Sequence, residues 1–119
     1  MLLAVLASSP VEAEALCTRI RNSRPGHSGT VEPVPFSNQE AFFSAIRSRR
    51  CGAAIIALGD TAGFLAARKL WETDHSFRIL MIDDTDRYAL QCIRIHVADF
   101  LIRPISDERL DRSLSLLLE

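Results

Sequence analysis

The stretch at residues 77–106 reads FRILMIDDTDRYALQCIRIHVADFLIRPIS, and its pattern decides the fold class of the chain. Its first segment, FRILMI at 77–82, is typical of a strand that is buried on both faces of a sheet. A short helix is predicted over Arg87–Arg94, and a second strand over Ala98–Leu101. Strand, helix and strand in this order form the unit from which parallel sheets are built.

The same alternation extends through the rest of the chain. Two further apolar runs, Leu2–Leu6 and Ala53–Leu58, predict strands buried on both faces. Thr30–Phe36 predicts a weaker strand. Because this strand contains Pro33 and Pro35, which cannot donate a ladder hydrogen bond, it is expected at an edge of the sheet.

Helical spacing fills the segments between these strands. Ser9 and Ser37 each open a capping-box pattern at the start of a predicted helix, and two more helices are predicted over Thr61–Glu72 and Ser106–Leu118. Five β–α units in a row predict a three-layer α/β sandwich around a five-stranded parallel sheet. The edge position of the second strand favours the flavodoxin-like order 2-1-3-4-5, with site residues at the carboxyl ends of the strands.

The composition describes one globular domain over residues 1–119. Lys and Arg number 14 and Asp and Glu 15, and the resulting net charge of −1 lacks the electrostatic footprint of sequence-independent nucleic-acid binding. No apolar run reaches the roughly 18 residues that span a bilayer, so no membrane partner is expected. Three cysteines, odd in number and far apart, indicate reduced thiols in the cytoplasm, and no metal-ligand or nucleotide-binding motif is present.

Two segments in the C-terminal part of the chain resemble response-regulator receiver domains: DRYAL at 86–90 and IHVADFLIRPIS at 95–106. They are most similar to the receivers found before LytTR-type DNA-binding domains, which commonly read D-x-Y-A-L and then x-H-A-x-D-Y-L-L-K-P-I. The resemblance implies a CheY-like fold and a role in the phosphorelay of a two-component system. It also implies that the chain is the N-terminal part of a longer transcriptional regulator, which contacts DNA only through a C-terminal domain absent here.

The resemblance implies a phosphoryl-transfer site, but most of the residues of that site are replaced. The family's acidic pair falls on Ala7 and Ser8, and its acceptor Asp on Leu58 or Gly59. Its Thr or Ser falls on Asp83, and its Lys on Arg103. In receivers, Mg²⁺ offsets the charge of three anionic oxygens brought beside a carboxylate. Loss of its ligands predicts a pseudo-receiver that binds no cofactor, is not an enzyme and acts through protein–protein interaction or dimerisation.

A vestigial receiver pocket is expected where these positions meet, comprising Ser8, Ser9, Asp60, Asp83, Asp84 and Arg103. Asp60 has two interpretations. It caps the following helix, as Asp does well at a strand-to-helix turn. Alternatively, it is a relocated phosphoacceptor with a rearranged Mg²⁺ site at Asp83 and Asp84, which would make the chain a phosphoryl-accepting response regulator. A remote third possibility is a sensor that binds a small anion at Ser8, Ser9 and Arg103.

Arg103 also has two interpretations. A charge-assisted pair with Asp83 is expected from the adjacency of the fourth and fifth strands. Otherwise, Asp84 or Thr85 caps the following helix and Asp83 is solvated. The family resemblance further implies a cis peptide bond between Arg103 and Pro104, since X–Pro is where the cis form is accessible.

The expected partner is a second copy of the chain. The resemblance places a homodimer interface on the predicted helix at 87–94, the strand at 98–101 and the helix at 106–118. The candidate interface residues are Arg87, Tyr88, Arg94, Asp99, Phe100, Arg109, Asp111 and Arg112. Their mixed charges suit a self-complementary two-fold contact, and they equally suit an ordinary surface laced with salt bridges. A histidine kinase or another signalling protein is the other partner that the resemblance implies.

Overall fold

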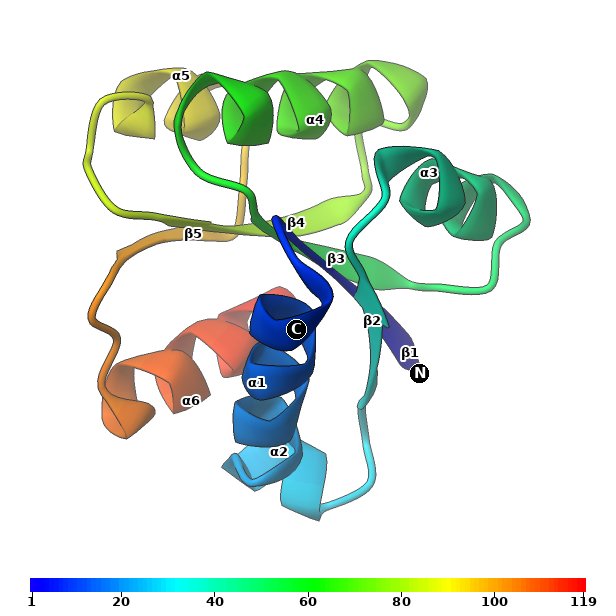
Figure 1. Ribbon diagram of the computed structural model, residues 1–119, viewed down its shortest axis with the longest axis vertical. Coiled ribbons are helices and arrows are strands. Elements are labelled where there is room, and N and C mark those ends of the chain that lie inside the picture. The colour runs from blue at the N-terminus through cyan, green and yellow to red at the C-terminus, as the bar shows by residue number, and fades with distance from the viewer.

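The computed structural model describes residues 1–119, and its centre is a five-stranded parallel sheet in the order β2-β1-β3-β4-β5 (Figure 1). The strands are β1 (Leu2–Ala7), β2 (Glu32–Phe36), β3 (Ala53–Ala57), β4 (Arg78–Asp83) and β5 (Asp99–Ile102). The expected order 2-1-3-4-5 is therefore confirmed. Pro33 and Pro35 lie in β2, which pairs with β1 alone and leaves its other side unpaired.

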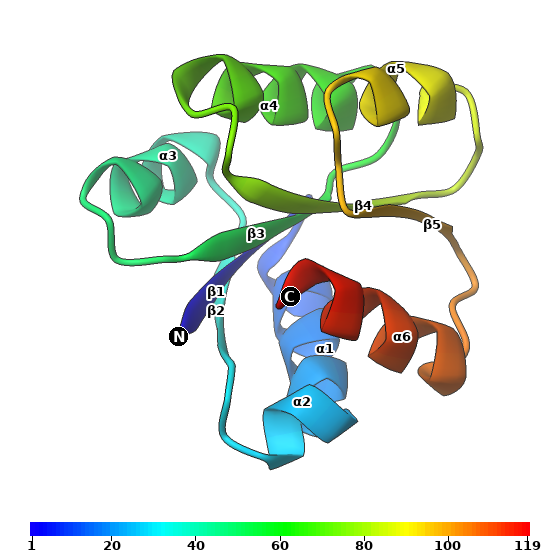
Figure 2. The same cartoon turned by 180° about the vertical axis from the view of Figure 1, so that it is seen from behind.

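Helices cover both faces of the sheet and complete the predicted three layers (Figures 1 and 2). One face carries α1 (Pro10–Arg21), α2 (Arg24–His27) and α6 (Asp107–Leu117). The other face carries α3 (Gln39–Arg47), α4 (Asp60–Thr73) and α5 (Ala89–Arg94). No helix combines the length and the apolar character that crossing a bilayer requires.

The central strands bury side chains on both faces of the sheet. Along β1, Leu3 and Val5 join the apolar cluster that includes residues of α1 and α6, whereas Ala4 and Leu6 join the cluster that includes residues of α3 and α4. Successive side chains of a strand point to opposite faces, so a strand between two helical layers must be apolar at every position. This is why Leu2–Leu6 is a continuous apolar run rather than an alternating one.

The caps of the helices agree with the sequence in part. Ser9 caps α1, and its side chain accepts the N–H of Glu12 at 3.2 Å. The Glu12 carboxylate does not close the expected capping box, because it accepts the Ser8 hydroxyl at 2.6 Å instead. At α3 the cap is Asn38 rather than Ser37: the Asn38 side chain accepts the N–H of Ala41 at 3.0 Å. Asn and Ser are equally good caps, so spacing alone does not choose between neighbours.

The short helix α2, between α1 and β2, is not among the helices predicted from the sequence. Ser23 caps it by accepting the N–H of Gly26 at 3.3 Å, and Pro25 lies in its first turn. Proline has a backbone angle suited to that position and lacks the N–H that would go unsatisfied there. Pro25, two residues after the capping serine, thus lies within a new helical turn.

The carboxyl ends of the strands form the edge at which the candidate site lies. Ala7, the last residue of β1, is in register with Ala57, the last residue of β3. Asp83, the last residue of β4, is in register with Ile102 of β5. The segments that follow these strand ends are therefore brought together, as expected for a parallel sheet of this order.

Candidate functional site

The buried carboxylate of Asp83 is the centre of the site. Asp83 is the last residue of β4, and it is 4 % exposed. One oxygen, Oδ2, accepts the backbone N–H of Asp60 at 2.9 Å, and the other, Oδ1, accepts that of Asp84 at 2.6 Å. Both oxygens of Asp83 thus accept backbone N–H groups, the carboxylate is not solvated, and no side chain pairs with it.

Gly59 lets the loop after β3 approach this carboxylate. Its φ angle is 76°, and a Cβ at this position would lie 3.1 Å from Oδ1 of Asp83. Both the left-handed backbone and the tight contact favour a residue without a side chain. A glycine here therefore allows the amide of the next residue, Asp60, to reach the buried carboxylate of β4.

Asp60 does not cap α4 with its own side chain, so that expectation was wrong. The cap position is Gly59, and no side chain caps the helix from it. The Asp60 carboxylate, which is 65 % exposed, instead forms an ion pair with Nη1 of Arg87 at 3.2 Å. Asp60 is the first residue of α4, one position beyond the cap, and its φ angle of 50° lies in the left-handed region.

Arg103 pairs with Asp84 rather than with the expected Asp83. Its Nη1 lies 3.2 Å from Oδ1 of Asp84, and its Nη2 donates to the carbonyl oxygen of Ala57 at 3.2 Å. Arg103 meets Asp83 only through the backbone, where its N–H donates to the Asp83 carbonyl at 2.9 Å. The two-pronged guanidinium thus ties the end of β5 to both β3 and the β4–α5 loop. The Arg103–Pro104 peptide bond is cis.

The β4–α5 loop is fastened to α4 by a contact that the sequence did not suggest. The hydroxyls of Tyr88 and Thr61 lie 2.7 Å apart, and the ring of Tyr88 stacks on Phe64 at 5.3 Å between centroids. The Arg87 guanidinium lies 5.6 Å from the centroid of the Tyr88 ring. The only available signal was that Thr61 and Phe64 share one face of a helix at a spacing of three residues.

The three acidic residues and Arg87 line one small pocket of about 310 Å³ at the ends of β3 and β4. Each carboxylate already has a partner: backbone N–H groups for Asp83, Arg87 for Asp60 and Arg103 for Asp84. No group of three or more His, Cys, Asp or Glu side chains is arranged to hold a metal ion. These residues therefore do not fit the acidic Mg²⁺ site that a receiver uses.

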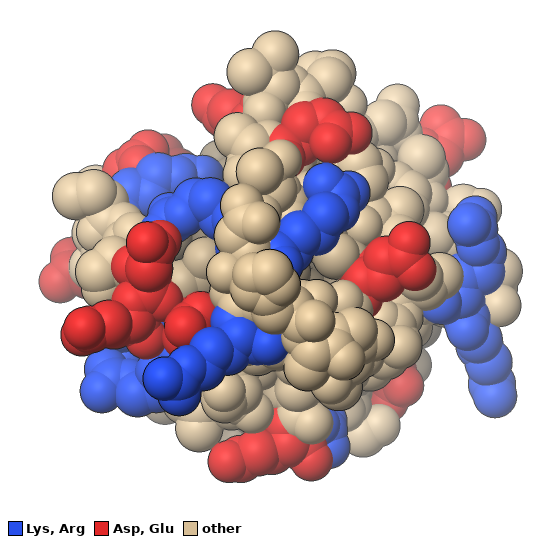
Figure 3. Space-filling view, turned by 90° about the horizontal axis from the view of Figure 1, so that it is seen from below, with Lys and Arg blue, Asp and Glu red and all other residues tan.

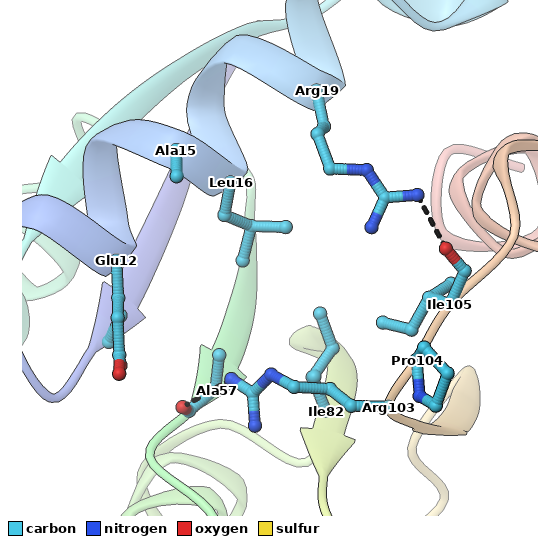
Figure 4. A pocket seen from close by; sticks show the side chains of 10 residues that line it. Glu12, Ala15, Leu16, Arg19, Ala57, Ile82, Arg103, Pro104 and Ile105 are labelled. Carbon is cyan, nitrogen blue, oxygen red and sulfur yellow. Dashed lines mark hydrogen bonds between the residues drawn. The ribbon is translucent and has the colours of Figure 1, made fainter.

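A second pocket, of about 590 Å³, lies on the other face of the sheet between α1 and the loop that precedes α6 (Figure 4). Its wall includes Ala7, Leu16 and Ala57, and Arg103 reaches across its floor to the Ala57 carbonyl. At its far end, Nη2 of Arg19 donates to the Ile105 carbonyl at 2.6 Å. Arg103 contributes to this pocket while pairing with Asp84 of the first, so one side chain links the two.

Ser8 and Ser9 are committed to α1. Ser9 is its cap, and the Ser8 hydroxyl donates to the Glu12 carboxylate. No hydrogen bond joins either hydroxyl to Arg103, whose guanidinium contacts Asp84 and the Ala57 carbonyl instead.

The fold was compared with known structures. A response-regulator receiver protein from Pseudoalteromonas atlantica is similar with a TM-score of 0.80 and 16% identity, over 99% of this chain and 97% of that one. A receiver domain protein from Clostridium thermocellum has a TM-score of 0.81 and 9% identity, over 98% of this chain and 93% of that one. A response regulator from Thermotoga maritima, in complex with Mg²⁺ and BeF, has a TM-score of 0.77 and 13% identity, over 98% of this chain and 97% of that one.

This is the fold of a response-regulator receiver domain. The resemblance seen in residues 86–106 and the CheY-like architecture are both consistent with it. No protein-family model and no curated protein matches the sequence.

In this receiver fold, the residues expected at a dimer interface fall into two groups. Asp99 and Arg109 are paired within the chain, with Nη2 of Arg109 at 3.1 Å from Oδ1 of Asp99. The buried Ser113 hydroxyl donates to the other Asp99 oxygen at 2.6 Å. The paired residues are therefore held within the domain.

Arg87 is likewise paired within the chain, with Asp60, and Tyr88 and Phe100 are half-buried. The second group is Arg94, Asp111 and Arg112, which form no ion pair. On the side of the molecule that carries α1, α2 and α6, acidic and basic side chains lie interspersed (Figure 3). That side therefore has no extended field of one sign.

Proposed function

We propose that the chain is the receiver module of a two-component-type transcriptional regulator and that it signals by binding protein, without accepting a phosphoryl group. The observation that supports this most is the internal pairing of its carboxylates. Arg87 and Arg103 bring a positive charge to Asp60 and Asp84, and two backbone amides bind Asp83. DNA binding would belong to a separate domain, of the LytTR type that follows the receivers which this sequence most resembles.

The residues that replace the acidic pair support the same proposal. Mg²⁺ requires hard oxygen ligands in near-octahedral geometry, and it is usually held by one or two carboxylates. Ala7 provides no ligand atom, and the Ser8 hydroxyl is bound to Glu12. A phosphoryl group at Asp60 would have to displace Arg87, or share it, without a metal to offset its negative charge.

The pseudo-receiver proposal is tested by titrating the protein with Mg²⁺ and beryllofluoride while recording amide NMR spectra. We expect the amides of Gly59, Asp60 and Asp84 to keep their chemical shifts beyond the small changes caused by Mg²⁺ alone. Saturable shifts that require both reagents would instead support the alternative, a phosphoryl-accepting response regulator that uses Asp60. An Asp60→Asn protein titrated in parallel assigns any such response to that carboxylate.

We further propose that the module forms a two-fold homodimer through α5, β5 and α6. Leu90 and Ile93 of α5 are 57 % and 62 % exposed, which leaves two large apolar side chains uncovered on one short helix. Arg94, Asp111 and Arg112, which have no ion-pair partner, belong to the same set of elements. An apolar centre surrounded by side chains of both positive and negative charge suits an isologous contact, in which the same patch of the two copies meets.

Sedimentation velocity over a range of protein concentrations tests the dimer. We expect Ile93→Glu to shift the protein to monomer, because it places a charge in the centre of the interface. Val11→Glu is the matched control, since Val11 is 78 % exposed but lies on α1. A wild-type protein that is monomeric at all concentrations, or two variants that behave alike, would contradict this assignment and indicate an ordinary charged surface.

A further inference from the structure

The pocket at the opposite edge of the sheet, where β3 and β4 begin, is lined by arginines that the proposed function does not use. Residues of the α3–β3 and α4–β4 turns line it, and both turns lie towards the same end of the sheet (Figures 1 and 2). Its volume is about 840 Å³, within the range of small-molecule sites. We propose that it binds a small phosphate monoester attached to a flat ring, as in a nucleoside monophosphate.

The charge of the pocket suits a dianion. Arg47, Arg49 and Arg78 line it, and none of them forms an ion pair, since the five ion pairs of the protein use other arginines. The single lining carboxylate, Asp74, accepts the hydroxyl of Ser76 at 2.6 Å and its N–H at 2.9 Å. Three positive charges and one negative charge leave a net charge of two positive charges in the lining. A phosphate monoester carries close to two negative charges at neutral pH and would balance them.

Asp74, the one carboxylate in the lining, is exposed and is held by its own turn. The two hydrogen bonds from Ser76 lower the pKa of Asp74, and the charge of Arg49 lowers it further. Asp74 therefore stays ionised and hydrogen-bonded to its own turn. Nη1 of Arg78 donates to the Leu117 carbonyl at 3.3 Å, whereas the guanidinium of Arg47 forms no ion pair or hydrogen bond and is free to bind a ligand.

The backbone at Arg49 points to a role beyond ending a helix. Its φ angle is 60°, its N–H donates to the Ile46 carbonyl at 2.9 Å, and the N–H of Arg50 donates to the Ala45 carbonyl at 3.2 Å. These bonds form the C-terminal motif whose left-handed residue is usually glycine. An arginine there breaks a local preference, and such positions are often functional.

The rest of the pocket wall is apolar. Ile46, Leu70 and Phe77 line it beside the arginines. A flat ring can lie against such side chains, and the planar guanidinium groups offer a further stacking surface. Inorganic phosphate alone would leave this part of the pocket unfilled, so the ligand is expected to carry both parts.

Isothermal titration of the full chain with adenosine 5′-monophosphate, at low salt, tests the proposal. Adenosine and inorganic phosphate are titrated separately, and each is expected to bind at least about tenfold more weakly. Arg49→Gly is the informative variant, because glycine suits the left-handed backbone and should keep the fold intact. It should weaken binding about tenfold or more, as expected for the loss of a charge-assisted hydrogen bond. Arg50→Ala, at the same helix end but outside the pocket lining, should change binding by less than about twofold.

Three results would overturn the proposal. The first is no saturable binding of the nucleotide, and the second is binding of inorganic phosphate as tight as that of the nucleotide. The third is an equal loss in Arg49→Gly and Arg50→Ala, which would mean that the arginines only provide a diffuse field and stabilise the end of α3. Thermal unfolding of both variants, recorded beside the titrations, shows that a loss of binding is not a loss of folding.

Discussion

The carboxylate of Asp83 accepts the backbone N–H of Asp60 at 2.9 Å, so a side chain at the end of β4 caps the helix that follows β3. The first amides of a helix need acceptors, and a negative charge near them is stabilised by the helix dipole. Because Gly59 offers no side chain of its own, the capping group comes from a neighbouring strand. This contact holds the two loops of the site in one arrangement without a phosphoryl group.

Replacing Asp83 by alanine should lower the free energy of unfolding by about 1–2 kcal/mol, because it removes the cap of α4 and leaves two partly buried backbone donors without acceptors. Urea denaturation measures the change. Asp86→Ala is the control: Asp86 is exposed, its side chain makes no hydrogen bond, and its replacement should cost less than about 0.5 kcal/mol. If the two variants are equally stable, the capping role of Asp83 is refuted.

Replacing Tyr88 should loosen the β4–α5 loop in proportion to what is removed. Tyr88→Phe loses the hydroxyl contact with Thr61, whereas Tyr88→Ala also loses the stacking on Phe64, worth about 0.5–1.5 kcal/mol beyond its buried area. Hydrogen exchange of the amides at 84–88 should therefore be fastest in Tyr88→Ala and intermediate in Tyr88→Phe. Identical exchange in all three proteins would show that the aromatic contact does not hold the loop.

Because its thiols are buried, the protein is expected to lose free energy of unfolding at alkaline pH. Burial is the main cause that raises the pKa of Cys17 and of Cys92 from 9.0 to about 11. Their contribution is fully present below pH 9, the value for an exposed thiol, and is lost as the pH rises towards 11, because only the unfolded chain ionises there. Melting temperatures between pH 7 and 11 should fall less in a Cys17→Ala, Cys92→Ala protein than in the wild type. Parallel curves would contradict the assignment.

The fold could be predicted because its signals are local and repeated. The continuous apolar run at Ala53–Leu58 predicts a strand covered on both faces, and the prolines of Thr30–Phe36 place that second strand at an edge. Together with the alternation of strands and helices, these signals predict the layers and favour the observed strand order. The ends of the elements were less exact, as at α5, which begins at Ala89 rather than Arg87.

The partners of the site residues could not be predicted in the same way. The sequence brought Asp60, Asp83, Asp84 and Arg103 to one edge of the sheet, and the structure places them there. Which of two adjacent aspartates turns inward depends on the pleat of β4 and on the position of the α4 amides. That is a property of packing between strands, and it was therefore hidden from a pattern along the chain.

The central claim, that this receiver fold takes no phosphoryl group, is tested most directly by intact mass. The protein is incubated with Mg²⁺ and a small phosphodonor such as acetyl phosphate, beside an ordinary receiver domain as a positive control and Asp60→Asn as a matched variant. We predict that the control gains one phosphoryl group while this protein keeps its mass. A gain of one phosphoryl group that disappears in Asp60→Asn would contradict the account and make Asp60 a relocated acceptor.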